Sequence, residues 1–160
     1  MMRRSIYVPL WPLEPYDKSW HVHRLGIWGE RAVARRLWFD GFRIIAHRWE
    51  SQNRSDIDLV AAKNDLLLFC EVKVRSSESE DVWLQVVDDK RLENLKDAAS
   101  AYLLETHQNR VNIQFNAYLV RPDTAAPRAP KIRVNSAYLN PAIIPGWRGI
   151  SAAAFRHAWQ

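Results

Sequence analysis

The sequence predicts an α/β fold in which a mixed β-sheet is flanked by α-helices. Two segments, 24–40 and 88–106, carry apolar residues at helical spacing. Two apolar runs of strand length, 56–61 and 66–75, are separated by a short polar turn, which is typical of a β-hairpin. The second helix lies between strand 66–75 and a further strand at 111–120, and this connection is long enough to join two parallel strands.

The composition is that of an ordinary globular domain. The chain has 160 residues, 48% hydrophobic and 26% charged, which is enough for one domain with a real core. A formal charge of +5 makes polyanionic partners plausible. The single cysteine, Cys70, excludes an intrachain disulfide and is expected to be a small buried apolar residue. No apolar run could span a bilayer, and prolines interrupt any signal-peptide core, so we expect a cytoplasmic protein without a membrane partner.

The N-terminal part should consist of an arm followed by a helix. Residues 1–20 hold three prolines and several aromatic residues, which predicts an extended arm lying on the domain. His21 and His23 could be half of a metal site, but no third ligand is nearby, so they are interpreted as arm sequence. The helix over 24–40 should end at Gly41. A domain over 21–140 and a tail over 141–160 complete the predicted organisation.

The remaining elements follow from the alternation of apolar and polar segments. A first strand is predicted at 42–49 and a polar loop at 50–55, before the hairpin. The acidic run 76–81 is interpreted as solvated surface, and 82–87 is ambiguous between strand and helix. Asp88 is a suitable N-cap for the helix that ends near Thr106. Strands at 111–120 and 131–134 complete the sheet, the last one at an edge.

The hairpin carries charges where core residues would be expected. Asp56 and Asp58 share one face of their strand, and Glu71 and Lys73 share one face of theirs. Burying such charges is unfavourable unless they are paired or bind a metal. Two carboxylates on adjacent strands can share Mg²⁺, and Lys73 could orient an attacking water or stabilise developing charge. An ordinary ion-pair network explains the spacing as well.

Glu30 lies on the first helix. Its structural role would be a favourable interaction with the helix dipole near the first turn. Its functional role would be to point toward the acidic strand face.

These residues resemble those of a nuclease superfamily. An Asp and a Glu-x-Lys on a hairpin, after a helix with Gly29-Glu30, resemble the PD-(D/E)XK nucleases. The sequence is more closely similar to the YraN-like family of bacterial Holliday-junction-resolvase-like proteins. The matching pieces are Gly26-x-x-Gly29-Glu30, Gly41-Phe42, Asp56-Ile57-Asp58-Leu59-Val60, Phe69-Cys70-Glu71-Val72-Lys73-Val74-Arg75, Ala99-x-x-Tyr102-Leu103 and Asn135-x-Ala137-Tyr138.

The resemblance implies a restriction-endonuclease-like core over 21–140 and a Mg²⁺-dependent endonuclease, with Mn²⁺ as a substitute ion. The implied substrate is DNA, including branched or Holliday-junction DNA. Asp58 and Glu71 would be metal ligands, with Asp56 tuning the site or supplying a second metal position. Lys73 would be the catalytic lysine and Glu30 an auxiliary acid. The implied nucleic-acid contacts are Arg31, Arg54, Arg75, Arg91 and Gln85. Resolvases that act on two strands are commonly dimeric, so the resemblance also allows a homodimer.

Two departures from the family pattern keep other functions open. Ser55-Asp56 stands where the family usually has Gly-Glu, and Gln114-Phe115-Asn116 stands where it usually has Arg-Phe-Asp. These changes favour a non-catalytic nucleic-acid-binding module that retains the fold. The eight tryptophans also allow a protein-interaction subunit.

Overall fold

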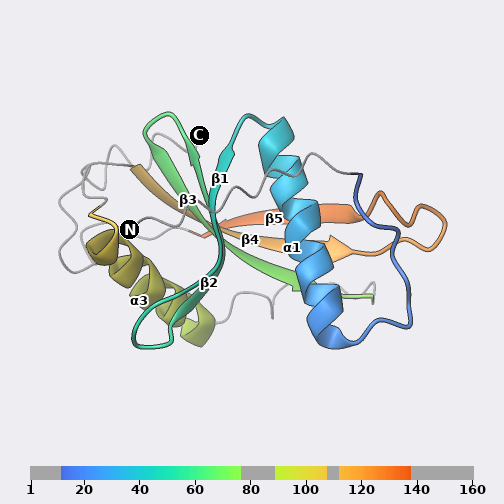
Figure 1. The fold of residues 1–160 in the computed structure, drawn as a ribbon, viewed down its shortest axis with the longest axis horizontal. Coiled ribbons are helices and arrows are strands. Elements are labelled where there is room, and N and C mark those ends of the chain that lie inside the picture. The colour runs from blue at the N-terminus through green and yellow to red at the C-terminus, as the bar shows by residue number, and fades with distance from the viewer. Residues whose placement is uncertain (1–11, 77–88, 108–111, 138–160) are drawn as a thin grey trace.

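The computed structural model of the protein describes residues 12–76, 89–107 and 112–137 (Figure 1). Two helices and five strands lie in these ranges. In chain order they are α1 (Val22–Phe39), β1 (Arg43–Glu50), β2 (Asp56–Lys63), β3 (Leu66–Val74), α3 (Asp89–Glu105), β4 (Asn112–Arg121) and β5 (Lys131–Ala137). The predicted α/β class is therefore confirmed, as are both helices and all five strands.

The five strands form one mixed sheet in the order β1-β2-β3-β4-β5. Strand β1 pairs antiparallel with β2, and β2 pairs antiparallel with β3 around a turn at Asn64, whose φ is +53°. Strand β3 then pairs in parallel with β4, with Phe69 opposite Phe115, and α3 lies in the connection between them. Strand β5 pairs antiparallel with β4 and is an edge strand, as predicted. This arrangement is consistent with a restriction-endonuclease-like fold.

The two helices pack on opposite faces of the sheet (Figure 1). Alternate residues of the strands point to different cores, because successive side chains of a strand alternate between its faces. On β3, Phe69 joins the core that contains Leu95 and Tyr102 of α3, whereas Cys70 joins the core that contains Val33 of α1. Cys70 is fully buried, as expected from its position in the middle of an apolar strand.

Helix α1 approaches β3 closely at Gly29. A Cβ atom on Gly29 would lie 2.2 Å from Cγ2 of Val74, far inside van der Waals contact. At Gly26, one turn earlier, a Cβ would find its nearest neighbour at 3.7 Å, the guanidinium of Arg48. Glycine at position 29 therefore sets how near the helix lies to the sheet, and it places the adjacent Glu30 on the buried side of α1. Gly41, with a φ of +89°, follows the end of the helix as predicted.

The described part of the arm lies on the domain, as expected. The indole Nε1 of Trp28 donates to the carbonyl of Glu14 at 2.7 Å, and the backbone N–H of Tyr16 donates to the carbonyl of Pro127 at 2.8 Å. The rings of Tyr16, Trp20 and Trp28 contact one another, which fixes residues 12–20 against α1.

Two expectations for the first helix were wrong. The interpretation of His21 and His23 as arm sequence is wrong, because His23 lies in α1 and His21 is its N-cap, with Nδ1 accepting the N–H of Arg24 at 3.3 Å. Glu30 does not lie in the first turn, since α1 begins at Val22, so the helix dipole does not explain it. The predictions for Asp88, the acidic run from residue 77 onward and the tail 141–160 lie outside the described residues. Within the described ranges, neither helix is long and apolar enough to cross a membrane.

Candidate active site

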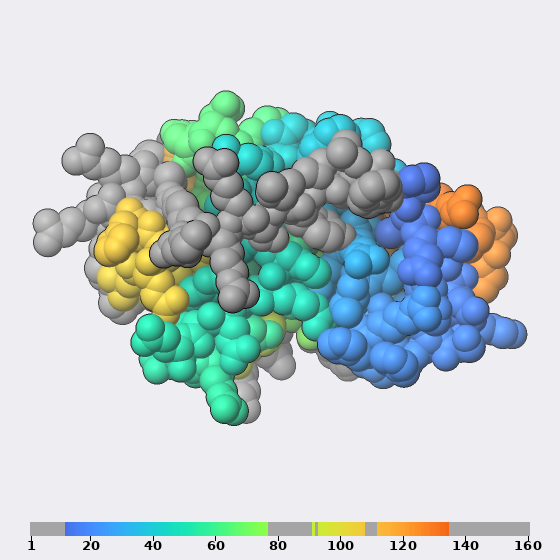
Figure 2. Space-filling view, viewed as in Figure 1, coloured from blue at the N-terminus to red at the C-terminus, as the bar shows by residue number. Residues whose placement is uncertain are grey.

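The candidate site lies where strands β2 and β3 separate. Their last pair is Leu59 with Cys70, immediately before Asp58 on one strand and Glu71 on the other. The backbone N–H of Val72 has no ladder partner on β2 and donates instead to Oδ2 of Asp58 at 2.7 Å. This side-chain hydrogen bond replaces the missing backbone pair and holds the Asp58 carboxylate beside Glu71. Figure 2 shows the β1–β2 region (teal) at the surface between α1 (blue) and α3 (yellow).

Glu71 is a buried carboxylate contacted by two cations from different elements. It is only 2% exposed. Nη2 of Arg91, in the first turn of α3, donates to Oε2 of Glu71 at 2.5 Å. Nζ of Lys73 lies 3.0 Å from Oε1 of Glu71, but outside hydrogen-bond geometry, so this contact is an ion pair and Oε1 accepts no hydrogen bond from the described residues. The predicted pairing of Glu71 with Lys73 on one strand face is present.

The electrostatics of Asp58 are unusual for an aspartate. Burial and the nearby negative charge of Glu71 raise the pKa of Asp58 to about 8, against the opposing effect of the Val72 N–H and the Arg91 charge. The pKa of Arg91 is also raised, but here the raised pKa favours the charged form. Burial alone would lower its pKa, but the hydrogen bond and charge of Glu71 raise it above the ordinary value. The ionised form of Asp58 is therefore disfavoured next to Glu71 unless a further cation approaches.

The raised pKa of Asp58 predicts a pH dependence of stability. The folded protein keeps a proton on Asp58 that the unfolded chain releases near its ordinary pKa of 3.8. The free energy of unfolding should therefore fall as pH rises from about 4 to about 8, so the Tm of the metal-free protein should decrease over this range and level off above about pH 8. Thermal unfolding in EDTA, compared with Asp58→Asn, measures this contribution. Equal pH profiles for both proteins would contradict it.

Glu30 is a buried carboxylate in a second charged cluster next to the first. Its Oε2 contacts Nε2 of His47 at 2.6 Å and Nε of Arg48 at 2.9 Å, and its Oε1 accepts from Nη2 of Arg48 at 3.0 Å. Burial alone would raise the pKa of Glu30, but these hydrogen bonds and the charge of Arg48 hold the pKa below its ordinary value. Its negative charge contributes to the raised pKa of Asp58, so the two clusters interact.

Sequence reasoning did not identify His47 as a site residue and did not pair Arg48 with Glu30. The two residues lie 17 and 18 positions from Glu30, on a different element. No local pattern signals such a contact. The only signal in the sequence for this contact is that Arg48 lies on β1, the strand that directly follows the helix carrying Glu30.

The chemistry of the donors fits a divalent cation at Asp58 and Glu71. Oε1 of Glu71 is buried without a hydrogen bond from the described residues, and Asp58 resists ionisation next to it. A divalent ion would give Oε1 of Glu71 a partner and would stabilise the ionised form of Asp58. Mg²⁺ is commonly held by one or two carboxylates together with waters and substrate phosphates. Asp56 is exposed and shares Arg91 with Glu71, since its Oδ1 lies 3.6 Å from Nη1 of that arginine. No group of three His, Cys, Asp or Glu side chains in the described ranges could hold a metal.

The predicted nucleic-acid contacts occupy different environments. The side chains of Arg31, Arg54 and Arg75 are exposed. Arg91 is turned inward to Glu71, and Gln85 lies outside the described residues.

The altered position at 116 lies on the face of the sheet opposite Glu71. Asn116 is paired with Cys70 on the α1 side of the sheet, whereas Glu71 follows on the opposite face. Its amide accepts from Gln114 at 2.8 Å and donates to the hydroxyl of Tyr118 at 3.0 Å. Asn116 is thus part of a buried polar row along β4, and it makes no hydrogen bond to Asp58 or Glu71.

The sequence is similar to proteins from several bacteria. The family described as "Uncharacterised protein family UPF0102" matches residues 29–123. A UPF0102 protein of Chlorobium phaeobacteroides is 35% identical over 101 residues, which cover 62% of this chain and 79% of that protein. One of Frankia casuarinae is 31% identical over 110 residues, covering 68% and 92%. A UPF0102 protein of a Bradyrhizobium species is 35% identical over 101 residues, covering 62% and 71%.

Proposed function

Because the chain belongs to UPF0102, the YraN-like family of the PD-(D/E)XK superfamily, we propose that it is a metal-dependent DNA endonuclease that hydrolyses phosphodiester bonds. The observation that supports this most directly is the pair of adjoining carboxylates, partly buried Asp58 and buried Glu71, with Lys73 beside Glu71. Such an arrangement costs stability unless a ligand compensates it. A divalent cation and a phosphodiester are ligands that would do so.

Each residue has a defined part in this proposal. Asp58 and Glu71 would hold Mg²⁺, or Mn²⁺ in its place. When bound, the ion would lower the pKa of a water and offset charge on the reacting phosphoryl group. Lys73, whose side chain is 36% exposed, would face the solvent side of Glu71 and orient the attacking water or balance the developing negative charge. Arg91 would hold Glu71 through Oε2, which leaves Oε1 for the ion, and its positive charge would attract a substrate phosphate to the same place.

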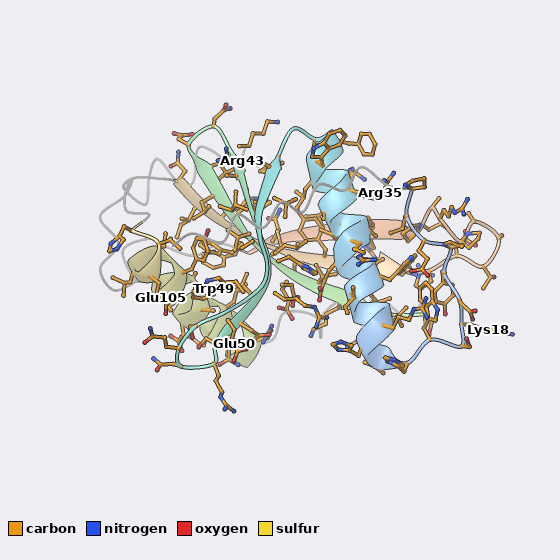
Figure 3. The ribbon with its side chains drawn as sticks, viewed as in Figure 1. Lys18, Arg35, Arg43, Trp49, Glu50 and Glu105 are labelled. Atoms are coloured by element: carbon orange, nitrogen blue, oxygen red, sulfur yellow. The ribbon has the colours of Figure 1, made fainter. Side chains whose placement is uncertain are left out.

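The proposal predicts Mg²⁺-dependent cleavage that requires Asp58. Purified protein should be incubated with duplex, single-stranded and four-way-junction DNA, with Mg²⁺, Mn²⁺ or EDTA. Cleavage should appear only with a divalent ion and should fall by at least about 100-fold in Asp58→Asn, because a ligand to the ion is weakened. Calorimetry should show Mg²⁺ or Mn²⁺ binding to the native chain and weaker binding to the variant. Glu105→Gln, at the exposed end of α3 (Figure 3), is the matched control.

The proposal fails if none of these substrates is cut with either ion and calorimetry detects no metal binding. That result would support the alternative function, a nucleic-acid-binding module without catalysis. One observation favours this alternative: Arg91 already neutralises Glu71 and lies 3.6 Å from Asp56, so the acidic site can be balanced without a metal. DNA binding that is equal in EDTA and Mg²⁺, without cleavage, would identify such a module.

A further inference from the structure

Arg48 has a backbone conformation that is rare for arginine. It lies inside strand β1, yet its φ is +50°, in the left-handed region that disfavours residues with a Cβ. Residues persist in such conformations only where their surroundings hold them, and these places are often functional. The conformation directs the Arg48 side chain toward α1, where Glu30 receives it.

Glu30 fixes the Arg48 guanidinium in a single orientation. The two groups form a two-point contact through Nε and Nη2, at 2.9 and 3.0 Å. The carboxylate is 6% exposed, whereas the arginine side chain is 39% exposed. The buried Glu30 carboxylate thus orients the half-exposed Arg48 guanidinium. Because the guanidinium is already oriented, it loses less conformational entropy when it binds a ligand. The third nitrogen of the guanidinium, Nη1, makes no hydrogen bond with the described residues.

The fixed guanidinium lies beside the carboxylate pair. Position 48 falls between the pairs His47 with Leu59 and Trp49 with Ile57, and is therefore across from Asp58 on β2. Its charge interacts with those of Asp58 and Asp56. Both oxygens of Glu30 contact His47 or Arg48, so its carboxylate is oriented toward β1.

We propose that Arg48 binds a phosphate of the DNA strand next to the Asp58–Glu71 site, and that Glu30 is a positioning residue that acts through Arg48. The inference rests on the proposed function, since it takes DNA as the ligand. It assigns Glu30 a part different from that of an auxiliary metal ligand. Arginine suits this task because its planar donors match phosphate oxygens.

The test compares DNA binding of Arg48 and Glu30 variants in EDTA, so that neither metal nor cleavage is needed. The probe is a fluorescein-labelled 20-nucleotide single strand, and its duplex form, read by anisotropy over a salt series. Arg48→Asn is the main variant, because asparagine accepts a positive φ and keeps the backbone while removing the guanidinium. Arg43→Ala is the control. It removes an exposed arginine from the opposite end of the same strand (Figure 3).

Arg48→Asn should weaken binding by roughly tenfold and reduce the slope of log K against log salt by about one, whereas Arg43→Ala should change neither much. Glu30→Gln should also weaken binding, although it removes a negative charge, which by long-range electrostatics alone would strengthen it. The double variant Glu30→Gln/Arg48→Asn should bind no more weakly than Arg48→Asn. Tm values confirm that each variant is folded.

Two results would overturn the inference. One is equal affinity of Arg48→Asn and Arg43→Ala, and the other is tighter binding by Glu30→Gln. If Arg48→Asn does not fold, Arg48→Lys keeps the charge without the two-point contact and should still bind more weakly. These outcomes are separate from those for the proposed function. A native protein that binds DNA through Arg48 but cuts nothing would refute the nuclease and retain the phosphate contact.

Discussion

Lys73→Ala is expected to remove DNA cleavage while leaving the fold and DNA binding nearly intact. The Lys73 ammonium is the cation that faces Oε1 of Glu71, at 3.0 Å, and it is more than one third exposed. A single group that stabilises charge in the transition state typically contributes about 100- to 1,000-fold to kcat. Glu71 keeps its hydrogen bond from Arg91 in the variant, so the buried charge is not left without a partner.

Single-turnover cleavage with saturating Mg²⁺ measures this effect directly. Lys73→Met tests the same loss of charge while keeping most of the aliphatic chain, and Lys131→Ala, exposed on the edge strand β5, controls for the loss of a surface charge. Affinity for uncut DNA in EDTA should stay within about threefold of the native value, because one exposed lysine adds at most one phosphate contact. Cleavage by Lys73→Ala at near-native rate would exclude the lysine from catalysis.

Gly29→Ala is expected to destabilise the protein strongly. The added methyl group would lie 2.2 Å from Cγ2 of Val74, so α1 or β3 must shift. Overpacking of this kind costs about 1–3 kcal/mol, and more where backbone has to move. Alanine has the higher helix propensity, by about 1 kcal/mol, so helix propensity alone would stabilise the variant. A fall in the free energy of unfolding would therefore show that the steric clash outweighs the gain in propensity.

Gly26→Ala is the matched control on the same helix. Its new methyl group would meet its nearest neighbour at 3.7 Å, an ordinary contact, so only the gain in helix propensity should remain. Urea unfolding should therefore move the midpoint down for Gly29→Ala and slightly up for Gly26→Ala. Equal shifts of both variants would show that the close approach of α1 to Val74 does not hold in solution. The pair Gly29→Ala/Val74→Ala should recover part of the loss, because the second change removes the clash.

The elements of the fold could be predicted from the sequence because their signals are local. Gly41 follows the end of α1 and Asn64 lies in the turn between β2 and β3, and both positions depend on the backbone preferences of one or two residues. The parallel pairing of β3 with β4 followed from the length of the connection between them. The predicted carboxylates and lysine are adjacent in the structure for the same reason, since a hairpin brings them together.

The environment of Glu30 could not be predicted from the sequence. Its partners His47 and Arg48 depend on how α1 lies across β1, and that placement is set by Gly29 against Val74 on another strand. The inward orientation of Arg91 depends likewise on the docking of α3, which brings a helix residue to a carboxylate 20 positions earlier. Contacts between elements follow from packing geometry, which one sequence does not record.

The hydrogen bond from Val72 to Asp58 makes one backbone amide a natural spectroscopic probe of the site. Its proton points at the carboxylate oxygen Oδ2 from 2.7 Å between heavy atoms, and it lies at the point where the two strands separate. The chemical shift of such a proton responds to the charge of its acceptor, because the acceptor polarises the N–H bond. A single resonance of an isotope-labelled chain can therefore follow protonation of Asp58 and any cation that arrives there, without altering a residue.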